Sequence, residues 1–268
     1  MPEGHVIHRL AREINSHFAG TAPVVTSPQG RFSAEASLID GRRLVTAQAF
    51  GKHLFIEFDA PTPQRIVSIH LGLIGSLRFD PPSETKGQIR LHIEGGEVAA
   101  NLRGPQWCRL ITDQEQAVAV GKLGADPLRP DADFDAVKAK VAGSSRSIGS
   151  LLMDQHLFAG VGNIYRAETL FRLGIDPMTP GRQLGPRLDA IWEDLVGLMS
   201  YGAKRGRIDT VRPQHTPEAM GRPPRKDDHG GEVYVYRRAG QPCFVCGTPI
   251  EHVVLEGRNL FWCPGCQN

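Results

Sequence analysis

Residues 152–165 read Leu-Met-Asp-Gln-His-Leu-Phe-Ala-Gly-Val-Gly-Asn-Ile-Tyr, and this stretch decides the fold of the second half of the chain. Apolar residues recur at helical spacing on both sides of its glycines, in 147–155 and in 163–173. We therefore expect two short helices joined by a glycine-rich turn, with Asn163 capping the second helix. Backbone N–H groups exposed by such a turn can hold a phosphate, and an ordinary helical hairpin is an equal alternative.

Four of the five cysteines form two pairs near the end of the chain, Cys243-x-x-Cys246 and Cys263-x-x-Cys266. This spacing predicts one structural zinc ion, because four thiolates complete a tetrahedral coordination sphere and leave no open position. The fifth cysteine, Cys108, lies in an apolar stretch and is interpreted as an ordinary buried thiol.

A β-hairpin is expected between the cysteine pairs, from strands at 250–255 and 259–262, with Arg258 near its turn. Such a small hairpin has little core of its own, so the metal would supply much of its stability. An arginine on a rigid, metal-held tip could grip a phosphate.

The opening Met1-Pro2-Glu3 carries a second chemical signal. If Met1 is removed, Pro2 becomes an amino-terminal secondary amine, and α-amines titrate near roughly 7.7–8.0. Apolar spacing predicts a helix over 3–18, whose positive dipole end would disfavour the protonated amine and favour an ionised Glu3. By itself the signal is weak, since many chains begin this way for no chemical reason.

Short strands separated by Gly, Pro and acidic residues dominate the region from about 23 to 112. This pattern favours an antiparallel sandwich or barrel. Lys52 follows Gly51 between two of these strands, which places it at a hairpin tip; a solvated turn lysine is the ordinary interpretation. The expected strands cover residues 43–50, 53–58, 65–71, 76–79, 88–93, 97–102 and 107–112.

Three domains are expected, at 1–132, 133–232 and 233–268. Prolines near 127–130 mark the first boundary, after which helical patterns replace strand patterns. A helix is expected at 186–201, then a mobile basic loop over 202–231, and a strand at 232–238 that leads into the cysteines.

Composition is that of an ordinary globular protein. The 268 residues carry a net charge of +2, so any basic surface must come from local clustering. No apolar run approaches the ~20 residues of a membrane span, and the first residues lack a signal-peptide core. We therefore expect a cytoplasmic protein without a membrane partner.

These motifs together resemble the formamidopyrimidine-DNA glycosylase and endonuclease VIII family. The resemblance covers essentially the whole chain: the Met-Pro-Glu-Gly opening, the Gly51-Lys52 hairpin, the 152–165 run and the Cys-Pro-Gly-Cys-Gln ending at 263–267 occur in matching order. It implies an α+β fold, with an antiparallel β-sandwich domain carrying an amino-terminal helix, then a helix-two-turn-helix domain that ends in a zinc-finger β-hairpin. The opening and the ending resemble the endonuclease VIII branch more closely.

The resemblance also implies roles for single residues. Pro2 matches the nucleophile that attacks C1′ of a damaged nucleotide, and Glu3 matches the catalytic acid. Lys52 matches a lysine that supports strand cleavage through a backbone phosphate. Asn163 matches a phosphate ligand, and Arg258 matches the zinc-finger arginine assigned to phosphate binding and to the second elimination.

The resemblance also implies further DNA contacts and one departure from the family pattern. Lys122 aligns with a basic DNA contact of endonuclease VIII. The segment that plugs the DNA stack falls on 70–75, where Leu73 replaces the methionine of the formamidopyrimidine branch. His5 departs from the family pattern, either as a local acid–base group or, more simply, as a polar contact.

The implied activity is that of a monomeric, zinc-containing, bifunctional DNA glycosylase and AP lyase of base-excision repair. It would act on double-stranded DNA with oxidised bases or abasic sites, in the cytoplasm and on the nucleoid. The endonuclease VIII branch favours oxidised pyrimidines. Two alternatives stay open: an enzyme of the same fold that prefers 8-oxoguanine and ring-opened purines, and a non-catalytic binder of damaged DNA that retains Met1.

Overall fold

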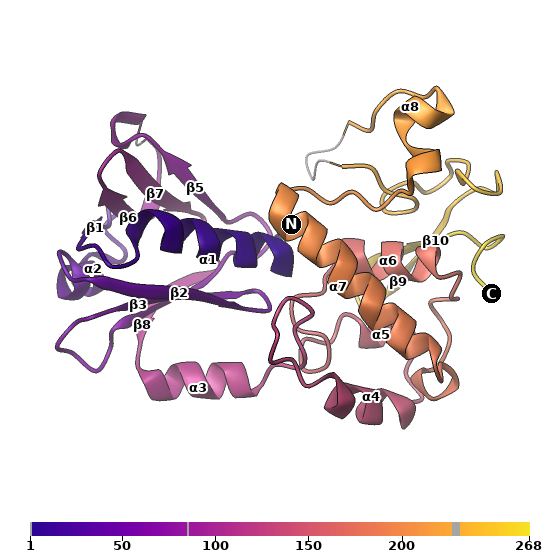
Figure 1. Ribbon diagram of the computed structural model, residues 1–268, viewed down its shortest axis with the longest axis horizontal. Coiled ribbons are helices and arrows are strands. Elements are labelled where there is room, and N and C mark those ends of the chain that lie inside the picture. Colours follow the sequence, from indigo (N-terminus) through magenta and orange to yellow (C-terminus); the bar gives the residue numbers. More distant parts are fainter. Residues whose placement is uncertain (1, 85, 227–230) are drawn as a thin grey trace. The chain divides into compact units, whose positions relative to one another are not determined.

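The computed structural model describes residues 2–84, 86–226 and 231–268, which fold as two compact units, 1–122 and 123–268 (Figure 1). The division therefore falls earlier than the expected boundary at 132. Two backbone hydrogen bonds explain why, since the Gly124 N–H donates to Gln155 O at 2.9 Å and the Ala159 N–H donates to Ala125 O at 2.9 Å. These bonds attach the segment after Leu123 to the helical unit.

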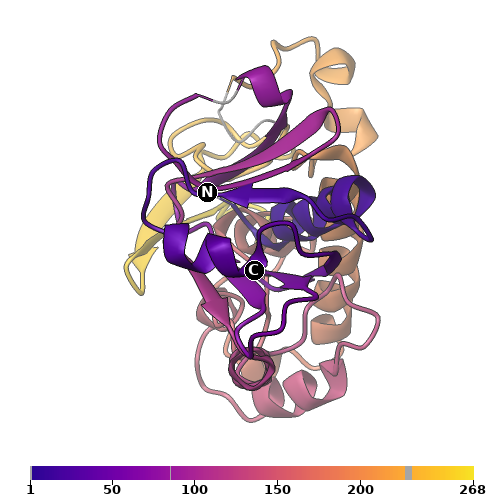
Figure 2. The same ribbon diagram turned by 90° about the vertical axis from the view of Figure 1, so that its left-hand side faces the viewer.

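Two antiparallel four-stranded sheets build the described part of the first unit, as the resemblance implied. Figure 2 shows the ribbon turned by 90° about the vertical axis. One sheet has the order β1-β6-β7-β5, with β1 (Val24–Thr26), β5 (Ser76–Asp80), β6 (Ile89–Gly95) and β7 (Val98–Arg103). The other has the order β2-β3-β4-β8, with β2 (Leu44–Phe50), β3 (His53–Phe58), β4 (Ile66–His70) and β8 (Trp107–Ile111).

The amino-terminal helix α1 (Gly4–Phe18) packs on β2 and β3. Its apolar stripe is buried in the core of the sandwich, because residues three and four apart share one face of a helix. The apolar stripe of α1 consists of Ile7, Leu10, Ile14 and Phe18.

The seven strands expected between residues 43 and 112 are all present, within a few residues of their expected ends.

The sequence patterns did not indicate three elements of this unit: β1, α2 (Ser33–Ile39) and α3 (Asp113–Gly121). Helix α3 has no buried residue, so it carries no apolar stripe to detect. It is held instead by a capping box, in which the side chain of Thr112 accepts from the Glu115 N–H and the Glu115 carboxylate accepts from the Thr112 N–H.

The described part of the second unit is helical and ends in the expected hairpin. Its core joins the helices to the cysteine-bearing segment, because Cys243, Ile250 and Phe261 are buried in the same cluster as the helical residues. The elements are α4 (Phe134–Ala142), α5 (Ile148–Leu151), α6 (Asn163–Arg172), α7 (Arg187–Arg205), α8 (Pro217–Met220), β9 (Glu251–Leu255) and β10 (Arg258–Trp262). Single turns of 3₁₀ helix occur at Pro82–Glu84 in the first unit and at Gly181–Gln183 and Pro213–His215 in the second.

Two expectations for the second unit were wrong. The strand expected at 232–238 is absent from the described residues, because the backbone N–H groups of Tyr234, Val235 and Tyr236 donate to the buried carboxylate of Glu168 rather than to a neighbouring strand. The expected loop is also more ordered than its composition suggested. Helix α7 extends to Arg205, and α8 lies within the loop; residues 227–230 of that loop lie outside the described residues.

In the described parts of the chain, no helix is both long enough and apolar enough to cross a membrane.

Candidate active site and metal centre

Pro2 and Glu3 lie directly at the start of α1. Glu3 is the residue before the first helical turn, in extended backbone, and its carbonyl accepts from the Val6 N–H at 3.0 Å. Its side chain is fully buried and makes no capping hydrogen bond to the helix. The buried carboxyl group of Glu3 is therefore held beside Pro2, which would be the amino terminus after removal of Met1. Met1 lies outside the described residues.

Lys52 reaches the same end of the first unit as Glu3, because β2 runs antiparallel along α1. The Gly20 N–H donates to Leu44 O at 2.8 Å, and the side chain of Asn15 exchanges hydrogen bonds of 2.8 and 2.6 Å with the backbone of Ala47. At about 1.5 Å per helical residue, the path from Asn15 back to Glu3 is about 18 Å. At about 3.4 Å per strand residue, the path from Ala47 forward to Lys52 is about 17 Å.

The turn that carries Lys52 has a defined geometry. Phe50 pairs with His53 across a two-residue loop, and Gly51 adopts φ +57°. A positive φ at the first loop residue is typical of a type II′ turn, which glycine adopts without strain. The predicted hairpin-tip position of Lys52 is therefore confirmed.

Three aromatic side chains lie side by side on β3, β4 and β8, and of these only His70 falls within the 70–75 segment that the resemblance implied. His53 is registered with His70, and His70 with Trp107. The rings of His70 and Trp107 stack at 4.5 Å, and His53 lies 5.4 Å from His70 and 5.6 Å from Trp107. The register of β3, β4 and β8 brings these residues together, and this register could not be predicted from the sequence pattern.

Burial lowers the pKa of three histidines of the first unit, His5, His53 and His70, and so favours their neutral form. Burial, and then the positive charge of Arg9, lowers the pKa of His5 to about 4. Burial, and then the neighbouring His70, lowers the pKa of His53 to about 4. Burial, and then the ammonium group of Lys52, also lowers the pKa of His70. This last effect shows that the Lys52 charge lies close to the aromatic cluster.

The segment after β4 displays two apolar side chains. Leu71 is buried, whereas Leu73 is 72% exposed and Ile74 is 87% exposed. The Gly75 N–H donates to Leu71 O at 3.0 Å, and a Cβ atom at Gly75 would lie 2.2 Å from that oxygen, so only glycine fits. We call residues 71–75 the apolar loop. It presents Leu73 and also Ile74, and both residues fall within the 70–75 segment that the resemblance implied.

Lys122 is the exposed residue that caps the carboxyl end of α3. Cys108 is a buried free thiol on β8, as expected, and burial raises its pKa to about 12.

In the second unit the structure brings Asn163 and Arg258 together. The Asn163 amide nitrogen donates to Asn259 O at 2.9 Å, and Asn259 follows Arg258 on β10. Gly162, not Asn163, is the capping residue of α6, so the expectation of an Asn163 cap was wrong. The side chain of Asn163 is used to hold the hairpin instead.

Arg166 strengthens the same junction and was not anticipated from the sequence. Its guanidinium is buried and donates to Gly149 O at 3.2 Å, to Asn259 O at 3.1 Å and to the side-chain oxygen of Asn163. A single side chain thus links the segments that carry α5, α6 and β10. Arg258 is exposed at the start of β10, on a hairpin whose position is fixed from beneath.

The hairpin turn also has a defined geometry. Leu255 pairs with Arg258 across Glu256 and Gly257, which adopt φ +48° and +74°. Two positive φ values in a two-residue loop are typical of a type I′ turn. Arg258 is therefore held at a tight, twisted tip, as the sequence predicted.

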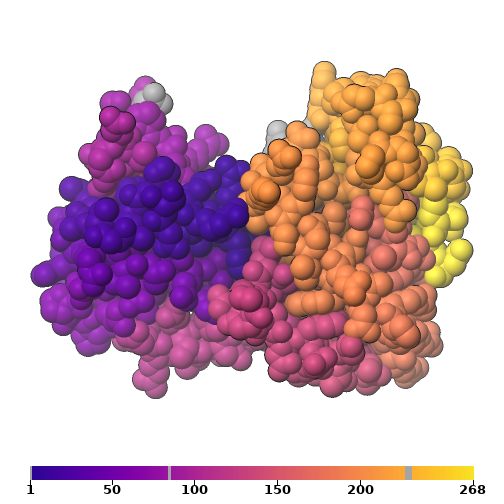
Figure 3. All heavy atoms as spheres, in the orientation of Figure 1, coloured from indigo at the N-terminus to yellow at the C-terminus, as the bar shows by residue number. Residues whose placement is uncertain are grey.

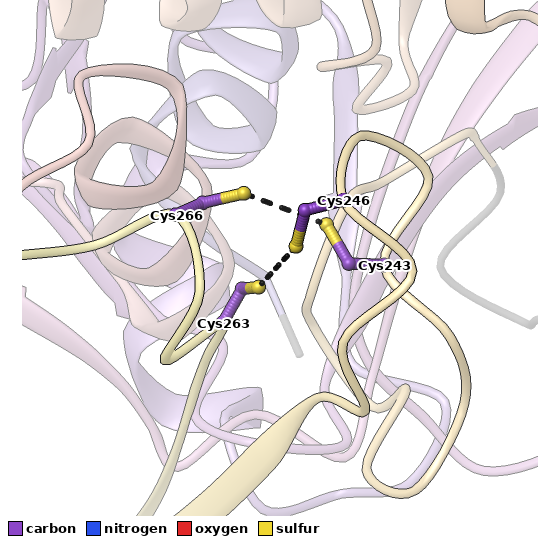
Figure 4. A group of neighbouring side chains, drawn as sticks. All are labelled: Cys243, Cys246, Cys263 and Cys266. Atoms are coloured by element: carbon purple, nitrogen blue, oxygen red, sulfur yellow. Dashed lines mark hydrogen bonds between the residues drawn. The ribbon is translucent and has the colours of Figure 1, made fainter.

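The four paired cysteines converge on one point (Figure 4). Their sulfur atoms all lie within 4.8 Å of one another, with 3.9 Å between Cys243 and Cys266 and 3.4 Å between Cys246 and Cys263. Zn–S bonds of about 2.3 Å in a tetrahedron place sulfurs about 3.8 Å apart. The residues therefore fit one zinc ion with four thiolate ligands, which is a closed, structural site.

Comparisons with known proteins point to one family along the whole chain. Residues 1–103 match the formamidopyrimidine-DNA glycosylase N-terminal domain, residues 123–212 match the formamidopyrimidine-DNA glycosylase H2TH domain, and residues 240–268 match the zinc finger found in FPG and IleRS. A protein named endonuclease 8 1 from Mycobacterium tuberculosis is 48% identical, with 100% of each chain covered. A formamidopyrimidine-DNA glycosylase from Methylococcus capsulatus is 32% identical, also with 100% of each chain covered.

Solved structures show the same fold. A complex of the Lactococcus lactis Fpg with DNA that contains an abasic site has a TM-score of 0.79 at 22% identity, with 99% of each chain covered. The MutM (Fpg) protein of Thermus thermophilus has a TM-score of 0.72 at 26% identity, with 99% of this chain and 98% of that chain covered. The chain thus belongs to the formamidopyrimidine-DNA glycosylase and endonuclease VIII family, and its greater similarity to the endonuclease 8 relative supports the endonuclease VIII branch.

Proposed function

We propose that this protein is a bifunctional DNA glycosylase and AP lyase of base-excision repair, which removes oxidised bases and then cleaves the strand. One observation carries the proposal: a fully buried Glu3 stands beside Pro2 at the end of the unit that Lys52 also reaches. The full-length similarity to proteins named endonuclease 8 and formamidopyrimidine-DNA glycosylase gives that arrangement its chemistry.

In this proposal, Pro2 acts as the nucleophile once Met1 has been removed. Its amine attacks C1′ and loses its proton, the bond to the base breaks, and the base leaves with a proton supplied by an acid. The sugar ring then opens to give an iminium ion, because the tertiary nitrogen has no proton left to lose. Glu3 is assigned the proton transfers that assist base loss and ring opening, which its burial beside Pro2 suits.

The iminium ion then drives strand cleavage. It acidifies the C2′ proton, and removal of that proton expels the 3′ phosphate. A second elimination expels the 5′ phosphate, so that a phosphate monoester remains on each side of the gap. We assign Lys52 to the stabilisation of the negative phosphate charge in these steps. The lowered pKa values of the neighbouring His53 and His70 favour their neutral forms, so the positive charge at this turn comes from Lys52.

The second unit is assigned to the DNA backbone. Arg258 stands exposed on a hairpin that Asn163 and Arg166 hold in place, which suits a cation that must meet a phosphate at a fixed position. Lys122 is assigned a further backbone contact. The zinc ion has no open coordination position and serves to hold the hairpin.

Base removal requires the damaged nucleotide to leave the stack, since C1′ is inaccessible in a stacked duplex. We assign the apolar loop to the gap that is left, because Leu73 and Ile74 are apolar side chains exposed in the free protein. The enzyme would work as a monomer on chromosomal DNA in the cytoplasm.

Oxidised pyrimidines are the proposed preference, by similarity to the endonuclease VIII branch. The test is single-turnover base release from matched duplexes that contain either thymine glycol or 8-oxoguanine. Faster release of thymine glycol is expected. Faster release of 8-oxoguanine would place the specificity with the other branch, and release of neither base by protein that lacks Met1 would favour a damaged-DNA binder.

A further inference from the structure

A basic hollow in the second unit has no part in the function proposed above. Its volume is about 400 Å³. Its lining comes from two segments, 222–226 after α8 and 232–244 before and within the first cysteine pair, and Figure 3 shows this orange and yellow part of the chain on the molecular surface. The cations that line it are Arg222, Arg225, Lys226, Arg237 and Arg238.

A single carboxylate, that of Glu232, opposes these cations among the described residues that line the hollow. One of its oxygens accepts from the Arg225 backbone N–H at 2.6 Å, and the other lies 2.6 Å from a guanidinium nitrogen of Arg222. Among the described residues that line the hollow, five cations and one carboxylate leave a net charge of +4. Cations crowded in this way repel one another unless an anion joins them.

Two of the guanidinium groups are fixed on the ring of Phe244, which lies between the first two zinc ligands. The guanidinium carbon of Arg238 lies 3.5 Å from the ring centroid, and that of Arg222 lies 4.1 Å from it. Arg238 is 4% exposed, and its hydrogen bonds to Tyr234 O, Pro242 O and the Gln241 side chain all go to neutral oxygens. The positive charge of Arg238 is therefore positioned without a hydrogen-bonded carboxylate among the described residues.

Arg237 occupies an unfavourable backbone conformation beside the hollow. Arg237 adopts φ +55°, in the left-handed region. For a residue with a Cβ atom this conformation costs roughly 1–2 kcal/mol, whereas glycine adopts it freely. Arg237 is exposed at the hollow, so an arginine stands where a glycine would be easier to fold.

We propose that this hollow binds a phosphate monoester, in the form of the terminal phosphate at a DNA strand break. A monoester carries close to two negative charges and three terminal oxygens, which suits several guanidinium forks better than a singly charged diester does. The inference rests on the proposed function, in which the two eliminations leave a monoester on each side of the gap. The hollow would then hold a product end after cleavage.

The test measures binding of the zinc-loaded full chain to short labelled single strands by fluorescence anisotropy. Three strands of one sequence carry a 3′ phosphate, a 5′ phosphate or hydroxyl ends, and inorganic phosphate serves as competitor. A phosphorylated end should bind about tenfold more tightly than the hydroxyl strand, which corresponds to one good charge-assisted interaction. Competition by millimolar inorganic phosphate that removes all discrimination would identify free phosphate as the ligand, and would overturn the assignment to strand ends.

Arg237→Gly separates binding from folding. The variant should lose most of the discrimination, while its unfolding midpoint rises because the strain is removed. Arg187→Gln, which removes an exposed charge at the start of α7 outside the hollow, should leave discrimination unchanged. Equal binding of all three strands by the wild type, or undiminished discrimination in Arg237→Gly, would overturn the proposal.

The strands are synthesised with their ends in place, so this measurement needs no catalysis. If end binding holds while the lyase chemistry fails, only the proposed function is refuted. If the chemistry holds while end discrimination is missing, only this inference is refuted.

Discussion

Glu168→Gln should destabilise the second unit strongly. The carboxylate of Glu168 is fully buried on α6 and accepts four hydrogen bonds. One oxygen accepts from the Thr210 hydroxyl at 2.6 Å and from the Tyr234 N–H at 2.7 Å, and the other accepts from the Val235 and Tyr236 N–H groups at 2.9 Å each. This one side chain thus holds the connector that leads from the basic loop to the zinc-binding segment.

Glutamine keeps the shape but replaces one acceptor oxygen with a donor NH₂ group. In its less costly orientation the NH₂ group faces Thr210, whose hydroxyl can turn to accept, and the Tyr234 N–H is left without an acceptor. A buried orphan donor costs about 1–3 kcal/mol. The remaining bonds to Val235 and Tyr236 also lose the strength that a charged acceptor gives them. We expect a loss of about 2–5 kcal/mol in the free energy of unfolding.

Urea unfolding of the zinc-loaded protein, followed by tryptophan fluorescence, measures this loss. Trp107→Phe as the common background leaves Trp192 and Trp262, which both belong to the second unit. Glu193→Gln, at an exposed position on α7, removes the same charge as a control. If Glu168→Gln unfolds within about 0.5 kcal/mol of that control, the carboxylate does not hold the connector and the reasoning is wrong.

Four other outcomes follow from the structure. Arg258→Ala should weaken binding to intact duplex DNA and reduce the slope of log affinity against log salt by about 0.9, since one phosphate contact is lost, and an unchanged slope would place Arg258 away from the backbone. Removal of zinc by a chelator should abolish the second elimination while the first unit keeps its circular dichroism signal, and activity that survives with the hairpin still folded would contradict a structural metal. Gly75→Ala forces the apolar loop to move and should slow base release about tenfold, a change of ~1.4 kcal/mol in the barrier. Cleavage of DNA that already contains an abasic site should stay nearly unchanged. Equal loss in both assays would refute the assignment of the apolar loop to the gap left by the flipped nucleotide. Stability of the first unit should fall as the pH drops from about 6.5 to about 4. His5 and His53 have a pKa of about 4 in the folded state and about 6.5 in the unfolded state, so the unfolded state binds more protons in this window. His53→Asn should flatten the pH dependence of stability measured by urea unfolding, and an unaltered profile would contradict burial of His53 as its cause.

Local patterns were enough to predict most of the first unit. Short apolar segments separated by turn residues located the seven strands from 43 to 112, including β4 and β7, which bury runs of consecutive residues. The same reasoning could not find α3, which buries no residue, although Thr112 and Glu115 carried the capping signal. Helical periodicity reports burial more directly than it reports helix formation.

Long-range contacts account for what the sequence did not predict. Backbone N–H groups in the expected strand at 232–238 donate instead to the carboxylate of Glu168, which lies more than sixty positions earlier in the chain. Asn163 has a capping side chain, yet it binds Asn259 on the hairpin. His70 joins the Lys52 end of the unit only through the register of β3, β4 and β8. None of these partners lies within the local window that a pattern surveys.

Borohydride trapping on a duplex with one abasic site tests the central claim most directly. Borohydride reduces the iminium ion to a stable bond, so protein that lacks Met1 should become covalently attached to DNA through Pro2. Pro2→Gly still offers a primary amine and should trap far less efficiently, and a variant that retains Met1 should not trap at this position. Absence of any trapped complex, from zinc-loaded protein shown by mass spectrometry to begin at Pro2, would contradict the lyase and leave a damaged-DNA binder as the better account.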